Sequence, residues 1–538
     1  MSASTSSGVH SVTPAEERRV IIASSLGTVF EWYDFYIYAT LAPFFASLFF
    51  PPGNDTAALL SAFATYAAGF LVRPFGALVF GRLGDMIGRK YTFLVTIVVM
   101  GSATFLTGLL PEFSAVGWLA PIVLVILRLA QGLALGGEYG GAATYVAEHA
   151  PHNKRGLRTS WIQITATVGL FLSLAVILAC RESMSVEDFR SWGWRIPYLV
   201  SLVLLGWSLY IRLKLNESPV FKRMKEEARG SKAPLTESFL RYPNNRFVFL
   251  ALFGAVAGQG VVWYTGQFQA LSFLTGTLKL SYDRAYLLLG CALLVATPLF
   301  VFFGWLSDKI GRLKIILAGC VIAAVTYFPL FHALSVAVNP DLTALNEKQL
   351  VSVAADNCNF HVFVGPWSDF TSCDRVRGQL TAAGLSFKSL PAEGGKEVVT
   401  VIGNARIEGF DLKTTPAMIT KALADIGYKP VADPKKVNYP LAFLWLFILL
   451  TYVTMVYGPM AAYLVELFPA KIRYTSMSFP YHIGNGWFGG LLPLFFTAIM
   501  AYSGNIYAGL WYPIVVAVVT AVIGALFLHE PKNVDIHD

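Results

Sequence analysis

Twelve apolar segments follow one another along this chain of 538 residues, and short polar connections separate most of them. A helix needs about 20 predominantly apolar residues to cross the hydrocarbon core of a bilayer. The pattern therefore predicts twelve membrane-spanning helices. They cover residues 20–48, 57–80, 91–110, 118–146, 158–180, 194–213, 246–275, 284–303, 315–336, 438–464, 476–501 and 506–528.

The segment 337–437 is the exception, because it is a long polar insert between the ninth and tenth predicted helices. Its β-branched run at residues 398–402 predicts a short strand. Thr415 and Pro416 begin a helical pattern that continues to Ile426 and ends at Gly427. We therefore expect a small α+β domain in an otherwise all-α protein.

Two of the five cysteines, Cys358 and Cys373, lie in the insert. On an oxidising face of the membrane they can form a disulfide, and two free thiols are the alternative. Cys180, Cys291 and Cys320 fall in predicted spans, where a cysteine is usually an ordinary buried side chain.

The composition also indicates a membrane protein, since 55% of the residues are hydrophobic and only 14% are charged, with a mean hydropathy of +0.57. A soluble domain cannot bury that much apolar side chain. The sequence has no phosphate-binding loop, no nucleophile motif and no His/Cys cluster with metal-ligand spacing. We therefore expect a carrier driven by an ion gradient, with no enzymatic activity, no metal and no other cofactor.

Lysine and arginine are concentrated in alternate connections, which the positive-inside rule places in the cytoplasm, so the net charge of +8 reflects orientation rather than nucleic-acid binding. These residues include Arg18, Arg82, Arg89, Lys154, Arg155, Arg212, Lys309, Lys471 and Arg473. The pattern predicts a cytoplasmic tail at 1–19 without a cleavable signal peptide, a bundle at 20–213, a cytoplasmic central loop at 214–245, helices seven to nine at 246–336, a periplasmic insert at 337–437, helices ten to twelve at 438–528 and a cytoplasmic tail at 529–538.

One loop sequence occurs twice, at residues 81–89 and 304–312, after the second span of each predicted half. Both copies have Gly, Leu, Asp, Ile, Gly and Arg in register, which indicates a carrier of two related six-helix halves. The glycines permit a tight turn, the Asp can face the N-terminus of a neighbouring helix, and the Arg can pair with an acid. We expect these contacts to break and reform as the halves rock. The glycines, aspartates and arginines of the two loops that we assign to this gate are Gly81, Asp85, Gly88, Arg89, Gly304, Asp308, Gly311 and Arg312.

The repeated loop resembles the signature of the major facilitator superfamily, and the resemblance extends over all twelve predicted helices. Further strings are similar to its metabolite:proton symporter branch: residues 30–36 (FEWYDFY), 73–76 (RPFG), 136–139 (GGEY), 192–197 (WGWRIP) and 217–221 (ESPVF). The resemblance implies two six-helix bundles in a bacterial-type inner membrane, a monomeric carrier, and uptake of a small organic anion with a proton as the coupling ion. It also implies that Glu148, at the end of span four, pairs with the loop arginine.

The resemblance is less specific about the class of substrate than about the family. A long loop at the position of the insert is similar to that of haloacid permeases, which favours a monocarboxylate such as acetate or a haloacetate. The alternatives are dicarboxylates and tricarboxylates, shikimate-like or aromatic acids, and proline or betaine. A more distant alternative is a membrane receptor that senses a solute through the insert.

Ionisable side chains inside predicted spans are costly and usually functional. Asp34 lies about 21 Å into span one, and Arg128 lies at an overlapping depth in span four. We expect the two to pair, as the equivalent residues do in related sugar:proton symporters. When Arg128 turns to a substrate carboxylate, Asp34 would take up a proton more readily. Glu31, one turn before Asp34, is a second proton candidate.

The other polar residues in the spans have less specific roles. Glu138 is expected to act as a gate or in packing, and Arg73 to pair with an acid at the cytoplasmic end. Substrate contacts are expected at mid-depth between the halves. Besides Arg128, the candidates are Tyr36, Gln163, Gln259, Trp263, Tyr264, Gln267, Tyr457 and Asn485. Trp263 and Gln267 are four residues apart and should share a helix face.

Overall fold

The computed structural model describes residues 14–50, 65, 68–362, 369–392, 394–395, 397–531 and 536. Ten helical segments within these ranges are long and apolar enough to cross a membrane: Arg89–Gly108, Leu119–His149, His152–Ser183, Phe189–Leu213, Asn244–Thr277, Tyr282–Ile310, Arg312–Val338, Tyr439–Leu467, Arg473–Ser503 and Ala508–Phe527. They coincide with predicted spans three to twelve. The first predicted span lies in α1 (Pro14–Phe49). The second ends in α3 (Arg73–Met86), and its residues 57–64 and 66–67 lie outside the described residues.

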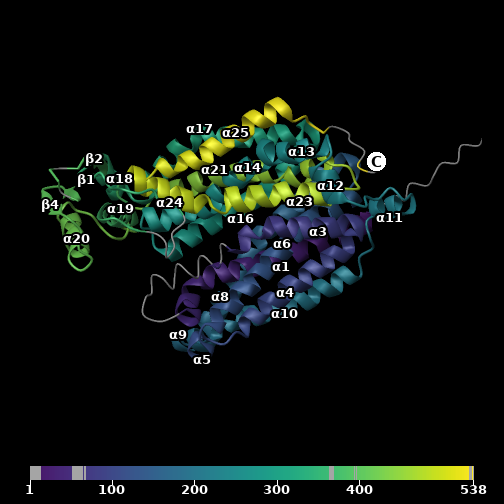
Figure 1. Ribbon diagram of the computed structural model, residues 1–538, viewed down its shortest axis with the longest axis horizontal. Coiled ribbons are helices and arrows are strands. Elements are labelled where there is room, and N and C mark those ends of the chain that lie inside the picture. Colours follow the sequence, from purple (N-terminus) through teal and green to yellow (C-terminus); the bar gives the residue numbers. More distant parts are fainter. Residues whose placement is uncertain are drawn as a thin grey trace, which may run out of the picture.

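The helices form two bundles that lie side by side, one from each half of the sequence (Figure 1). Besides α1 and α3, the first bundle contains α4 (Arg89–Gly108), α5 (Phe113–Val116), α6 (Leu119–His149), η1 (His152–Lys154), α7 (Arg155–Gln163), α8 (Thr165–Ser183), α9 (Val186–Asp188), η2 (Phe189–Gly193) and α10 (Arg195–Leu213). The central loop forms α11 (Pro219–Glu226) and α12 (Pro234–Phe239).

The second bundle has the same order of long helices, with π-helical turns in the seventh and eleventh spans and an interruption in the tenth span at residues 458–459. Its elements are α13 (Asn244–Ala251), η3 (Leu252–Val256), α14 (Ala257–Tyr264), η4 (Thr265–Gln269), α15 (Ala270–Ser272), η5 (Phe273–Thr277), α16 (Tyr282–Ile310), α17 (Arg312–Val338), α21 (Tyr439–Tyr457), α22 (Met460–Leu467), α23 (Arg473–Ile483), η6 (Gly484–Gly489), α24 (Leu492–Ser503), η7 (Ala508–Leu510) and α25 (Trp511–Phe527). The segments η3, η4, η5 and η6 are π-helical turns, which contain one extra residue and often occur near functional sites.

The insert folds as a small α+β domain at one end of the second bundle (Figure 1). Its elements are α18 (Pro340–Glu347), β1 (Val351–Ala354), α19 (Ser372–Ala382), β2 (Lys388–Leu390), β3 (Val399–Ile402), β4 (Ala405–Glu408) and α20 (Thr415–Asp425). The sheet has the order β2-β1-β3-β4, in which only β1 and β2 are parallel. The predicted strand and helix of the insert correspond to β3 and α20.

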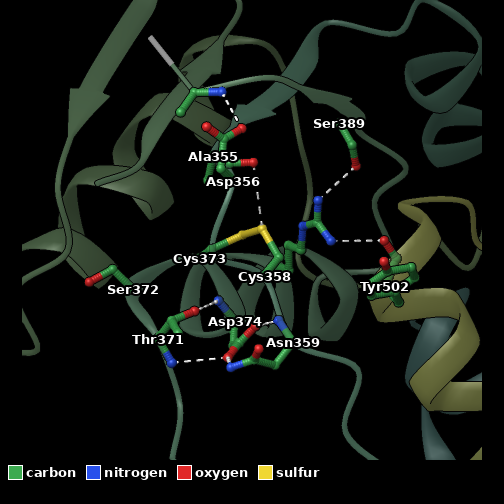
Figure 2. Close-up of a disulfide and its surroundings, with 12 residues drawn as sticks. Ala355, Asp356, Cys358, Asn359, Thr371, Ser372, Cys373, Asp374, Ser389 and Tyr502 are labelled. Carbon is green, nitrogen blue, oxygen red and sulfur yellow. Dashed lines mark hydrogen bonds between the residues drawn. A yellow bond between two sulfur atoms is a disulfide. The ribbon is translucent and has the colours of Figure 1, made fainter. Parts of the chain in front are cut away.

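A disulfide joins Cys358 to Cys373 at the start of α19 (Figure 2). The insert is attached to the connections of the second bundle by hydrogen bonds. The Phe387 amide donates to the Gly504 carbonyl at 2.7 Å, and Arg377 Nη1 donates to the Tyr502 carbonyl at 3.0 Å. These contacts join the insert to the second half of the chain.

Candidate functional site

The two copies of the repeated loop lie at the end of the molecule opposite the insert, which we call the repeat-loop end. Asp85 accepts hydrogen bonds from the amides of Tyr474 and Thr475, at 3.2 and 2.9 Å, in the first turn of α23. Asp308 accepts from the amides of Gly156 and Leu157, at 2.8 and 2.9 Å, in the first turn of α7. Each carboxylate therefore faces the positive end of a helix, as predicted.

In both cases the helix belongs to the opposite half. The first loop holds the second half, and the second loop holds the first. The two halves are thus joined reciprocally at the repeat-loop end, which is closed in this structure.

A cluster of buried charges accompanies the first loop. Arg89 Nη2 lies 3.3 Å from Asp85 Oδ1 and 3.7 Å from Glu148 Oε1. Glu148 Oε1 also accepts from Arg473 Nη1 at 2.9 Å, and its other oxygen accepts from the Ser218 hydroxyl. The predicted pairing of Glu148 with the loop arginine is confirmed. Arg473 adds a contact from the other half that the sequence analysis did not foresee.

The second loop has an equivalent cluster with the halves exchanged. Arg312 Nη2 lies 3.2 Å from Asp308 Oδ1 and 2.8 Å from Glu466 Oε1. Arg155, from the first half, lies 3.4 Å from the same Glu466 oxygen. Each cluster therefore has two arginines and two acids, and one arginine in each comes from the opposite half.

A second internal repeat carries Glu148 together with Arg155, Glu466 and Arg473, whose roles the sequence analysis missed. Residues 145–155 and 463–473 share the pattern Tyr-x-x-Glu-x-x-Pro-x-x-x-Arg. This pattern places Glu148 and Arg155 after span four, and Glu466 and Arg473 after span ten. A search for further repeats at equivalent positions of the two halves would have found all four residues.

The last glycine of each repeated loop adopts a backbone conformation that is essentially restricted to glycine. Gly88 has φ 136° and Gly311 has φ 112°. A Cβ atom at Gly88 would lie 2.3 Å from Glu217 Oε2, and one at Gly311 would lie 2.8 Å from the Glu530 carboxyl. Glu217 accepts from the Lys90 amide at the start of α4, and Glu530 accepts from the Leu313 amide at the start of α17. The two glutamates, which follow spans six and twelve, thus occupy equivalent positions.

Burial raises the pKa of the Glu217 carboxyl above its ordinary value. The Ser218 and Lys90 amides oppose this shift, because they donate hydrogen bonds to the charged form.

A narrow cavity lies between the two halves, with space for about one water molecule. Its walls come from both bundles: Thr28, Glu31, Trp32, Arg73 and Tyr139 from the first, and Trp263, Tyr264, Tyr457, Tyr481, His482 and Asn485 from the second. Aromatic rings close it across the interface, with centroids 5.5 Å apart for Trp32 and Trp263 and 3.6 Å apart for Tyr139 and Tyr481. A metabolite can enter this cavity only if these rings separate.

Five of the predicted candidates line this cavity: Glu31, Trp263, Tyr264, Tyr457 and Asn485. The others lie around it. Gln163 donates to the Tyr139 hydroxyl at 2.9 Å, Gln259 exchanges two hydrogen bonds of 3.0 Å with Asn485, and Tyr36 stacks on Trp32.

Gln267 is buried and does not line the cavity. The expectation that it shares a helix face with Trp263 stays a prediction.

Arg73 lies at the cavity rather than in an ion pair at the end of the bundle, so that expectation is wrong. Its guanidinium carbon is 4.4 Å from the centroid of Phe70 and 5.4 Å from that of Phe35. No acid of the described residues lies within ion-pair distance of it. Arg73 also lines a second, smaller cavity together with Arg128 and Gln131. Among the described residues, it is the one arginine or lysine in the wall of the central cavity.

Asp34 and Arg128 are connected through two other side chains and do not pair directly as predicted. Arg128 Nη1 donates to Gln131 Oε1 at 2.7 Å, Gln131 Nε2 donates to Thr104 Oγ1 at 2.6 Å, and Thr104 Oγ1 donates to Asp34 Oδ2 at 2.9 Å. All four residues are buried. The side chains of Thr104 and Gln131 lie between the carboxylate and the guanidinium, so these two groups do not meet.

Glu138 forms a buried ion pair with Arg212 of α10 and accepts from the Thr96 hydroxyl of α4 at 2.8 Å. Arg212 was expected in the cytoplasmic loop, but it is 1% exposed and lies over the Phe93 ring. Since all of these residues belong to the first half, the pair supports packing within that bundle and does not join the halves.

Comparison with known proteins agrees with this architecture. Residues 20–241 match the family model described as "Sugar (and other) transporter". The shikimate transporter of Escherichia coli is 38% identical over 323 residues, which are 59% of this chain and 72% of that protein. The proline/betaine transporter of Escherichia coli is 35% identical over 58% of this chain and 64% of that protein.

A solved structure of the proton:xylose symporter XylE, a major facilitator superfamily protein, aligns with a TM-score of 0.60 over 97% of this chain and 98% of that one, at 14% identity. This likeness concerns the fold. Together with the two closely related transporters, it shows that the chain belongs to the major facilitator superfamily and is a multi-pass membrane transporter, not an enzyme.

Proposed function

We propose that this protein is a proton-coupled symporter that takes up a small organic acid. The observation that carries the proposal is the central cavity, which is bounded by both halves and has Arg73 in its wall. A guanidinium in an apolar, aromatic surrounding binds a carboxylate strongly, because water does not screen the interaction. Mid-depth between the halves is where a carrier binds its substrate.

The charge clusters at the repeat-loop end supply the alternating access. Asp85, Asp308, Glu148 and Glu466 each contact a group of the opposite half. These contacts are lost when the halves separate, and the acids then retain Arg89 and Arg312 from their own half. The gate therefore opens without leaving an isolated buried carboxylate.

Proton coupling is assigned to Asp34, with Arg128 and Glu31 as its electrostatic neighbours. A substrate carboxylate that draws Arg128 or Arg73 toward the cavity weakens the stabilisation of both carboxylates and favours protonation. Glu31 lies in the cavity wall, and its Oε2 has no hydrogen-bond partner among the described residues. It is therefore the second candidate for the proton.

The cavity wall favours a ring-containing, hydroxylated acid of the shikimate type. Six aromatic side chains supply flat apolar faces, and Tyr139, Tyr457 and Tyr481 supply hydroxyl groups beside them. The similarity to the shikimate transporter supports this choice. Acetate or a haloacetate, which the insert favoured, would leave most of these rings without a contact.

A zwitterionic osmolyte such as betaine is a second candidate. Aromatic faces attract quaternary ammonium groups, Glu31 offers a negative charge, and Arg73 can hold the carboxylate. The similarity to the proline/betaine transporter supports this alternative.

We also propose that the repeat-loop end and both termini face the cytoplasm, that the insert lies in the periplasm and that a single chain transports. The disulfide in the insert supports this orientation, because it requires an oxidising compartment.

The test is uptake into proteoliposomes with an imposed pH gradient. The substrates are shikimate, 2-oxoglutarate, chloroacetate, acetate and betaine. We expect the gradient to accelerate shikimate uptake. The Asp34→Asn variant should lose this acceleration but should still exchange shikimate inside the liposomes for shikimate outside. The symport proposal is wrong if the gradient accelerates none of the substrates. The assignment to Asp34 is wrong if the variant still accumulates substrate.

A further inference from the structure

We propose that Thr104 is a positioning residue for proton coupling, which keeps Asp34 hydrogen-bonded both with and without its proton. This inference rests on the proposed role of Asp34. Thr104 lies on α4, is fully buried, and is the one hydrogen-bond partner of Asp34 among the described residues. A residue in this position determines which hydrogen bonds the Asp34 carboxyl group can form when it is ionised and when it is protonated.

The Thr104 hydroxyl has two acceptors within reach but only one hydrogen to donate. One acceptor is Asp34 Oδ2 at 2.9 Å, and the other is the Met100 carbonyl at 3.0 Å on the same helix. The hydroxyl oxygen also accepts from Gln131 Nε2 at 2.6 Å. The two donations compete, so at any moment the hydroxyl donates either to Asp34 or to the Met100 carbonyl.

The two orientations match the two states of Asp34. When Asp34 is ionised, the hydroxyl donates to it and still accepts from Gln131. When Asp34 is protonated, its own O–H donates to the hydroxyl oxygen, and the hydroxyl turns and donates to Met100. In this second state Thr104 accepts twice and donates once, which uses its full hydrogen-bonding capacity.

The exchange needs a rotation about one bond and no movement of a helix. An unpartnered buried carboxylate or hydroxyl would be costly in either state. Thr104 therefore keeps both states of the carrier accessible, as a symporter requires, because Asp34 must gain and lose its proton in every cycle.

The other ionisable groups around Asp34 are Glu31 and Tyr33 on α1, Arg128 on α6 and Tyr198 on α10. None of them is within hydrogen-bond distance of Asp34 in the described part of the chain. Their electrostatic effect should be the same in variants that change only the hydroxyl.

The test is an infrared pH titration of the purified full-length protein in liposomes, in which protons are the only ligand. The carboxyl band that disappears in Asp34→Asn reports Asp34. In Thr104→Val we expect the midpoint of this titration to move upward by about one pH unit, because a hydrogen bond to a charged acceptor is stronger than one to a neutral group by about that amount. Thr104→Ser should restore the midpoint of the unmodified protein.

Thr107→Val is the matched control. Thr107 is buried on the same helix, and among the described residues its hydroxyl bonds only to the Ala103 carbonyl, at 2.9 Å. This variant should leave the midpoint unchanged. The inference is overturned if Thr104→Val titrates like the unmodified protein, if Thr107→Val shifts equally, or if Thr104→Ser does not restore the midpoint.

The titration uses no substrate, so its result is independent of the transport assay. If Asp34→Asn retains gradient-driven uptake, the proposed role of Asp34 fails whatever Thr104 does. If that variant loses coupling while Thr104→Val titrates normally, only the role of Thr104 fails.

Discussion

The buried Glu148 carboxylate should decide how strongly the repeat-loop end stays closed. Its contact with Arg473 at 2.9 Å joins the halves, and both side chains are at most 1% exposed. Removing one partner of a buried ion pair costs about 3–5 kcal/mol. We take the lower value, because Arg473 keeps hydrogen bonds to the carbonyls of Phe468 and Ile536. About 3 kcal/mol corresponds to a shift of about two orders of magnitude in the equilibrium between closed and open.

The assay is a distance measurement between spin labels at Lys154→Cys and Lys309→Cys. Both lysines are exposed at the repeat-loop end, one in each half, and the background lacks the three unpaired cysteines. Glu148→Gln should add a population with a longer distance. Glu138→Gln is the control, because its ion pair with Arg212 lies within one half. The reasoning is refuted if Glu148→Gln leaves the distances unchanged, or if Glu138→Gln lengthens them equally.

Three further outcomes follow from single contacts. Gly88→Ala should destabilise the protein by about 1–3 kcal/mol, seen as a lower melting temperature, since the new Cβ would meet Glu217; an unchanged melting temperature would contradict this. Arg73→Lys should weaken shikimate binding about tenfold or more, measured by calorimetry, because an ammonium cannot form the two parallel bonds of a guanidinium; equal affinity would remove Arg73 from the site. Burial opposes ionisation of Asp374, but hydrogen bonds from His361 and backbone amides outweigh it and hold the pKa of Asp374 below its ordinary value. Its stabilisation of α19 is therefore present above the unfolded-state pKa of about 4 and is lost as pH falls further, so hydrogen exchange in α19 should accelerate on acidification in the unmodified protein and lose this dependence in Asp374→Asn.

Local patterns determined much of the architecture. Ten of the predicted spans coincide with membrane-length helices, because apolar length and short polar breaks act within each segment. The loop motif predicted that Asp85 and Asp308 would face helix N-termini, since a short carboxylate beside a turn has few other donors. The insert's strand at 399–402 and its α20 helix were also visible in the sequence.

The partners of the buried charges were not visible in this way. The sequence placed Asp34 and Arg128 at the same depth in the membrane, because depth follows from the number of residues between each side chain and the end of its helix. Whether two side chains meet also depends on how each helix is rotated and on what lies between, and here Thr104 and Gln131 lie between them.

The same reason explains the remaining differences. The pattern of basic residues placed Arg212 in a loop, and Arg73 was expected to pair with an acid at the cytoplasmic end. Instead, Glu138 holds Arg212 inside the bundle and aromatic rings surround Arg73. The sequence by itself determined the spans, the two halves and the closing loops. Only the tertiary structure decided which charges meet, because those contacts join residues as distant as Glu148 and Arg473, and their geometry depends on the packing of the whole bundle.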